Sequence, residues 1–183
     1  KKYKNYDYGL IFSGLIFCIG IGSFLLHTIP SKITALVDVM FILFFFLFFL
    51  YLLYREVLKL TIMYALFLSL ASPIFYYYLG SSLKENILLV GDSSFYIVIL
   101  LHLNLIYFYL LVKKENFNNY ILFAGIIFLI SIFFRIIDKV YCDINLYGTH
   151  FLWHILNSLV LFYLVKFIIS NLSFHPKNTN QVL

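Results

Sequence analysis

Charged residues are scarce in this 183-residue chain, where Asp, Glu, Lys and Arg together make up 11% of the sequence. An average soluble domain carries about a quarter charged residues, so the composition excludes an ordinary water-soluble globule, a disordered tail and a nucleic-acid-binding domain. Only three prolines and two cysteines are present. The cysteines, Cys18 and Cys142, are too few for a disulfide framework or for a metal site built from thiolates alone.

Apolar and aromatic residues dominate instead. Hydrophobic residues make up 63% of the chain and aromatic residues 21%, and the mean hydropathy is +0.98. A helix that crosses a bilayer needs about 20 apolar residues, and charged or turn-forming clusters divide this chain into six such segments. We therefore predict an all-α, multi-pass membrane helix bundle that forms one transmembrane domain over residues 1–183. The predicted spans are residues 8–29, 33–54, 60–79, 87–112, 120–137 and 149–169. Asp92, Ser93 and Ser94, near the start of the fourth span, could instead belong to the preceding loop.

The basic residues predict how the bundle is oriented. The connections between the predicted spans are short, so consecutive helices run antiparallel. Nine lysines and arginines then fall on the side of the amino terminus and four on the opposite side. By the positive-inside rule, both ends of the chain are cytoplasmic, and the net charge of +5 reports orientation rather than an anionic partner. The nine are Lys1, Lys2, Lys4, Arg55, Lys59, Lys113, Lys114, Lys166 and Lys177, and the four are Lys32, Lys84, Arg135 and Lys139.

Five polar residues in the predicted spans share one depth. An ionisable side chain in a span costs about 3 kcal/mol unless it is paired, coordinated or hydrated. His27 ends an outward-running helix, and Asp38 lies near the start of the inward-running helix that follows. His150 and His154 occupy the first two turns of the last, inward-running helix. With Ser23, one turn before His27, they are predicted to lie in the outer part of the membrane, toward the exterior or lumen.

Their spacing narrows the chemistry. Ser23 and His27 are four residues apart, as are His150 and His154, so each pair projects from one helical face. Three imidazoles with a nearby carboxylate, Asp38, suit a catalytic zinc site, which takes three protein ligands and keeps an open position for water. The spacing alone also allows histidines that hydrogen-bond within the bundle or belong to a proton pathway.

Other polar residues have structural interpretations. His102 and Asn104 stand in the middle of the fourth predicted span and are expected to hydrogen-bond between helices. Asp138 and Asp143 are expected to be solvated carboxylates of the last outer loop. Trp153, close to the start of the last span, is expected to anchor the chain at the membrane interface.

The scarce polar residues resemble the signature of a known family. A GSxxxH pattern ends at His27, an aspartate follows eleven residues later at Asp38, and an HxxWH pattern runs from His150 to His154. This combination resembles the alkaline ceramidases, members of a superfamily of seven-helix membrane hydrolases that includes the progestin and adiponectin receptors. Asp138 with Cys142 is similar to a weaker family feature just before the last helix.

The resemblance implies a function and a role for each residue. It implies a zinc-dependent amidase that releases a fatty acid from an N-acyl lipid such as ceramide, with His27, His150 and His154 as metal ligands. Asp38 would move the proton of the attacking water to the leaving amine. Ser23 would hydrogen-bond that water or the developing oxyanion. The implied partners are the lipid substrate and the membrane, and the oligomeric state is left open.

The chain departs from the family at its amino terminus. Family members have seven helices and this chain has six predicted spans, so the resemblance implies either that a first helix, entering from the exterior, has been lost before Lys1 or that this is a six-helix variant. Calcium is doubtful, because the acidic, tryptophan-containing segment that looks like a calcium site in the family is absent from this sequence. Three alternatives stay open: a receptor-like protein with a structural zinc, a hydrolase of another lipid amide or ester, and a transporter with an intramembrane His and Asp relay.

Overall fold

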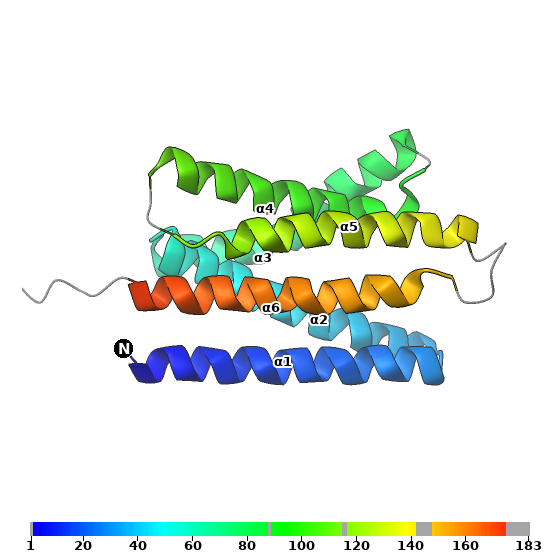
Figure 1. Ribbon diagram of the computed structural model, residues 1–183, viewed down its shortest axis with the longest axis horizontal. Helices are drawn as coiled ribbons and strands as arrows, with labels where there is room; N and C mark the ends of the chain where they lie inside the picture. Colours follow the sequence, from blue (N-terminus) through cyan, green and yellow to red (C-terminus); the bar gives the residue numbers. More distant parts are fainter. Residues whose placement is uncertain (1, 88, 115–116, 142–147, 175–183) are drawn as a thin grey trace, which may run out of the picture. The chain divides into compact units, whose positions relative to one another are not determined.

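The computed structural model describes residues 2–87, 89–114, 117–141 and 148–174, so Cys142 and Asp143 lie outside the described residues. Within these ranges the chain forms six α-helices and no strand (Figure 1), and each helix is long and apolar enough to cross a membrane. The prediction of an all-α, multi-pass membrane protein is confirmed. The helices are α1 (Lys2–Thr28), α2 (Lys32–Leu52), α3 (Ile62–Asn86), α4 (Ser94–Val112), α5 (Tyr120–Tyr141) and α6 (His150–Phe174).

The break between α1 and α2 is a capped turn. The Ser31 side chain accepts a hydrogen bond from the Thr34 backbone N–H (3.1 Å), and the Thr34 hydroxyl accepts one from the Ser31 backbone N–H (2.9 Å). This reciprocal pair is a capping box, worth about 1 kcal/mol to a helix start. It sets where α2 begins, and Pro30 just before it disfavours continuation of α1.

Several helix ends differ from the sequence prediction, and three of these differences concern the turns around α3. A five-residue π-helix, Leu53–Val57, continues α2 through Arg55, whose guanidinium donates to the Leu60 carbonyl (2.9 Å). Helix α3 runs to Asn86 rather than to residue 79, because its polar last turns are compatible with a helix although they are not apolar. The next helix starts late, since Gly91 with φ of 49° begins a 3-10 turn ahead of α4.

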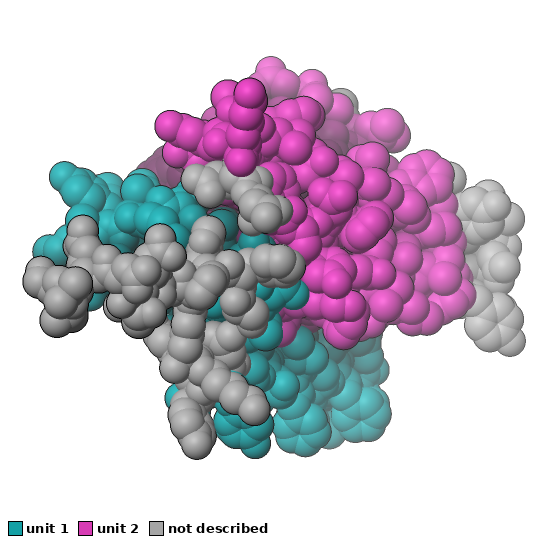
Figure 2. Space-filling model, turned by 60° about the vertical axis from the view of Figure 1, so that its left-hand side comes forward, with its two compact units in different colours: residues 1–69, 168–183 teal, residues 70–167 magenta. Residues whose placement is uncertain are grey.

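The described chain divides into two compact units, coloured separately in Figure 2. Unit 1 comprises Lys1–Ser69 with Ile168–Leu183, and unit 2 comprises Leu70–Phe167. Within unit 1, α1 packs along α2 (Figure 1), and the buried ring of Phe12 contacts two phenylalanine rings of α2. Within unit 2, α4 packs against α5. The boundary passes through α3 and α6, which contribute to both units.

Aromatic packing fills the core of unit 2. Trp153 is only 5% exposed and packs edge-on against Tyr96, with ring centroids 4.7 Å apart, and against Phe128 at 6.4 Å. The expectation that Trp153 anchors the chain at the interface is therefore wrong. The position of Trp153 near a span end suggested an anchor, but its side chain points into the packed interior of the unit.

Polar residues in unit 2 bond to protein partners. The His102 Nδ1 and the Tyr76 hydroxyl form a hydrogen bond that joins α4 to α3, as expected for a bundle histidine. Asn104 instead donates to the Leu100 carbonyl of its own helix (2.8 Å), which corrects the expected interhelical bond. His102, bonded to Tyr76, is therefore not a member of the histidine group described below.

Candidate metal centre

A close helix contact in unit 1 sets Asp38 beside α1. A Cβ added to Gly22 would lie 3.0 Å from the Asp38 Cα and 3.3 Å from its backbone nitrogen. Such distances leave room for a hydrogen atom and little else, so glycine permits the approach. His27 follows little more than one turn later, at the end of α1. The contact therefore places the start of α2 next to the histidine-bearing end of α1.

The Asp38 carboxyl group stands out within this contact. Its Oδ1 atom is buried, and it accepts no hydrogen bond from the described residues. A buried polar atom without a partner costs free energy and is commonly explained by function or by a bound water or ion. Asp38 thus fits a group that acts on a molecule bound at this end of the helices.

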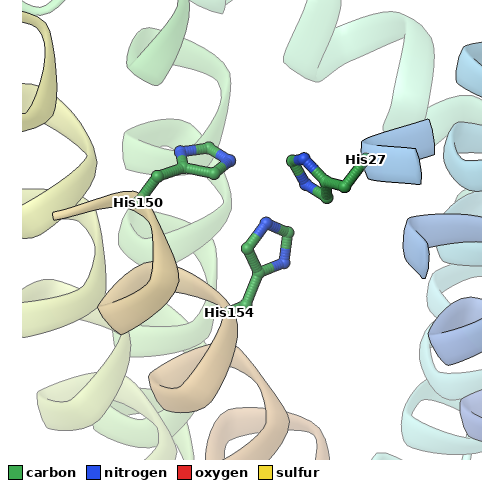
Figure 3. Close-up of side chains that lie close together, drawn as sticks. All are labelled: His27, His150 and His154. Carbon is green, nitrogen blue, oxygen red and sulfur yellow. The ribbon is translucent and has the colours of Figure 1, made fainter. Parts of the chain in front are cut away.

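In unit 2, the first two turns of α6 present two histidines on one face. The rings of His150 and His154 lie 4.8 Å apart between centroids and are inclined by 77°. In Figure 3 both rings project to the same side of α6. The spacing of four residues produces this arrangement, because side chains one turn apart stack on one helical face.

Asp138 supports this histidine pair from α5. Its Oδ2 lies 3.5 Å from the His150 Nδ1, and its Oδ1 accepts a hydrogen bond from the Thr149 backbone N–H (2.6 Å). The Thr149 hydroxyl donates to the Phe134 carbonyl of α5 (2.8 Å). These bonds fasten the start of α6 to the end of α5.

The expectation that Asp138 is a solvated loop carboxylate is therefore wrong. Its side chain is only 16% exposed, because α5 continues to Tyr141 and keeps the residue within a helix. In metal sites, a carboxylate beside one ring nitrogen of a histidine commonly fixes the tautomer and the orientation of the ring. Asp138 thus has the position of a group that orients a metal ligand.

The three predicted ligands form one group. His27, His150 and His154 each offer one ring nitrogen, and these nitrogens all lie within 4.8 Å of one another (Figure 3). Nitrogens bound to one tetrahedral zinc lie about 3.3 Å apart, given Zn–N bonds of about 2.0–2.1 Å. Imidazole is also a preferred ligand of zinc. The three side chains are therefore ones that zinc accepts.

Ser23, the fifth predicted residue, is half-buried on α1, one turn before His27. Two further residues were not predicted for a site. Asp138 was assigned to a loop, and Arg135, one turn before it on α5, was used only to orient the chain. Their spacing could have linked them, because residues three apart in a helix lie on the same side of it. At Asp138 this side of α5 faces the start of α6.

Comparison with known proteins gives no match: no protein-family profile, curated protein or solved structure matches this chain. The likeness to the alkaline ceramidases therefore remains an expectation that rests on the signature residues. Function is inferred below from the chemistry and geometry of those residues.

Proposed function

We propose that this chain is a zinc-dependent integral-membrane lipid amide hydrolase, ceramidase-like in its chemistry, that releases a fatty acid from an N-acyl lipid. The observation that supports this most is the grouping of His27, His150 and His154 within 4.8 Å. Three neutral imidazoles with one open position are the ligand set of catalytic rather than structural zinc. A carboxylate beside a ring nitrogen of one ligand histidine, as Asp138 lies beside His150, is a common addition to such sites.

His27, His150 and His154 would hold the metal. When bound there, zinc supplies a Lewis acid that polarises a carbonyl oxygen and acidifies water. Asp138 keeps His150 in the tautomer and orientation that binding requires. Thr149 holds Asp138 in turn through its backbone N–H.

Asp38 and Ser23 would act on the substrate. The Asp38 carboxylate takes a proton from the attacking water and passes it to the amine nitrogen that leaves. Its buried Oδ1, which accepts no bond from the described residues, is available for that proton. The Ser23 hydroxyl donates a hydrogen bond to the oxygen on which negative charge develops. Together they provide a base and an oxyanion donor from neighbouring helices of unit 1.

The acyl chain would lie in the surrounding bilayer. Phe24 next to Ser23 is 66% exposed, and Leu36 close to Asp38 is 61% exposed. Large apolar side chains with this exposure on membrane-spanning helices contact lipid tails. A lipid amide can thus reach these residues laterally while its tail stays in hydrocarbon. The positive-inside rule, applied to the basic residues of the sequence, supports the exterior or lumenal face for this end of the helices.

The test is fatty-acid release by the purified chain. A panel of N-acyl and O-acyl lipids is incubated with wild type and with His154→Ala, and released fatty acid is measured by mass spectrometry. His102→Gln is the matched control, because His102 is a bundle histidine bonded to Tyr76. We expect release by wild type and by the control and none by His154→Ala. Equal release by His154→Ala would overturn the proposal, and release from O-acyl lipids alone would identify an esterase.

A further inference from the structure

A polar pocket in unit 2 adjoins the histidine pair. It has a volume of about 130 Å³, enough for a small polar group, and its lining comes from the turn before α4, the end of α5 and the start of α6. One lining residue, His150, also belongs to the histidine group. Whatever occupies the pocket therefore lies beside a proposed metal ligand. The lining residues are Asp92, Ser93, Arg135, Asp138 and His150.

Arg135 is the cation of this pocket, and two aromatic rings hold it. Its guanidinium carbon lies 5.0 Å from the centre of the Tyr96 ring and 4.7 Å from that of Trp153. Cation–π contacts of this kind fix the plane of a guanidinium without using its N–H donors in the way that a carboxylate does. Among the described residues Arg135 has no carboxylate partner within ion-pair distance. Its donors can therefore serve a ligand oxygen.

The two carboxylates of the pocket are held by other groups. Asp92 accepts a hydrogen bond from Lys84, with the two charged atoms 2.7 Å apart. Asp138 accepts from the Thr149 backbone and lies beside His150. A carboxylate accepts several hydrogen bonds, so both can still accept one from a ligand hydroxyl. Each carboxylate would repel an anionic ligand at this short range.

A ligand for the pocket is thus defined by charge and by hydrogen bonding. It needs an oxygen that accepts from Arg135 and a hydrogen that can be donated to Asp92 or Asp138. A hydroxyl group supplies both. A phosphate or carboxylate supplies only acceptors and adds negative charge next to two carboxylates.

We propose that this pocket binds the polar head of the lipid substrate and selects an uncharged, hydroxyl-bearing head over an anionic one, with Arg135 as the specificity-determining donor. The inference rests on the proposed function for the bond that is cleaved, since His150 both lines the pocket and is a proposed metal ligand. Binding of the head itself needs no reaction. It can therefore be measured separately from zinc content and from hydrolysis.

Trp153 provides the measurement, because it is the chain's only tryptophan and contacts the Arg135 guanidinium. The full chain in detergent micelles is titrated with 1-O-hexadecylglycerol, which has two hydroxyls and no bond that a hydrolase of amides or esters can cleave. The matched ligand is the 3-phosphate of the same lipid. We expect a saturable fluorescence change with the alkylglycerol and binding at least about tenfold weaker for the phosphate, a difference of about 1.4 kcal/mol.

Three variants assign the effect to named residues. Arg135→Gln should weaken alkylglycerol binding about tenfold or more, as expected for loss of a hydrogen bond to a charged group. Arg55→Gln, at the chain's other arginine in unit 1, should leave binding unchanged. Asp92→Asn should strengthen binding of the phosphate lipid about fivefold by removing one repelling charge. Asp92 is 59% exposed, and a gain of binding cannot come from a chain that fails to fold.

Two results would overturn the inference. One is phosphate binding as tight as alkylglycerol binding. The other is a fluorescence change that has the wild-type affinity in Arg135→Gln or that never saturates, which indicates partition into micelles only. If bound zinc and fatty-acid release are found together with either of these two results, the proposed hydrolase is retained and the head-group pocket is rejected. If the expected titrations are found without zinc or release, the pocket binds lipid heads and the proposed hydrolase falls.

Discussion

A methyl group on Gly22 would lie 3.0 Å from the Cα of Asp38, so α1 and α2 touch backbone to backbone just before the end that carries His27. Contacts this close need small residues, which are favoured where membrane helices pack tightly. The relationship ties the position of the proposed base to a single glycine in the neighbouring helix. If Asp38 is the base, the close contact at Gly22 helps to set its position.

Replacement of this glycine should reduce activity. Gly22→Ala pushes α2 away by a few tenths of an ångström or more, and a catalytic group misplaced by 1 Å can cost about 100-fold in rate. Gly14→Ala is the matched control on the same helix, because a Cβ there meets nothing within 4 Å. We expect fatty-acid release to fall at least about tenfold in Gly22→Ala and to stay at the wild-type rate in Gly14→Ala. Equal rates in both variants would show that the close contact does not position Asp38.

Loss of the Asp38 carboxylate should separate metal binding from catalysis. Asp38→Asn keeps the size of the side chain but cannot take a proton, and general-base catalysis is worth about 10²–10⁴ in rate. The zinc content should stay that of wild type, since the proposed ligands are the three histidines. Turnover and zinc content are measured on the same preparation. A rate within about twofold of wild type, against that expected loss, would remove Asp38 from the mechanism.

Asp138 should influence the metal without binding it. Asp138→Asn keeps an oxygen to accept from the Thr149 N–H but removes the negative charge beside His150. Changes of this kind typically weaken metal affinity about 10–100-fold. The control is Asp7→Asn, at an exposed carboxylate near the start of α1. Competition with a chromophoric zinc chelator measures the affinity, and unchanged affinity in Asp138→Asn contradicts the orienting role.

A buried serine next to α6 should contribute to stability. Ser131 is fully buried and donates a hydrogen bond to the Asn157 Oδ1 (2.9 Å), which links α5 to α6. Interhelical hydrogen bonds in membranes are worth about 0.6–1.7 kcal/mol, so Ser131→Ala should lower the thermal unfolding midpoint in detergent. Ser13→Ala should not, because Ser13 is exposed and its hydroxyl bonds only to its own helix. A midpoint unchanged in Ser131→Ala would mean that this bond adds no net stability.

The helices themselves were predictable from the sequence. Runs of apolar residues locate all six, because the hydrocarbon core requires about 20 such residues for each span. The helix ends were less predictable where a helix extends beyond its apolar segment. Helix α3 continues through polar residues to Asn86, since a helix can extend beyond its apolar stretch. The Ser31 cap was recognisable, because a serine followed three residues later by a hydrogen-bonding side chain marks a helix start.

The histidines were noticeable in the sequence because polar residues are rare in the predicted spans. In a chain with so few polar residues, spacing and depth suggested that His27, His150 and His154 lie at one level, and only the family resemblance favoured a metal site over hydrogen-bonded histidines; their ring nitrogens lie within 4.8 Å of one another. Trp153 and Asp138 were misjudged because position along a span does not tell which way a side chain points. The pocket around Arg135 is formed by three separate elements, which no local pattern in the sequence can reveal.

The most direct test of the zinc hydrolase is the metal content of the purified chain. Zinc is counted by mass spectrometry in wild type, in the alanine variants of His27, His150 and His154, and in His102→Gln, all prepared without chelator. We expect about one zinc per chain in wild type and in His102→Gln, and far less in each alanine variant, since a site with three protein ligands loses most of its affinity with any one of them. Wild type without zinc, or alanine variants that retain it in full, would contradict the central claim.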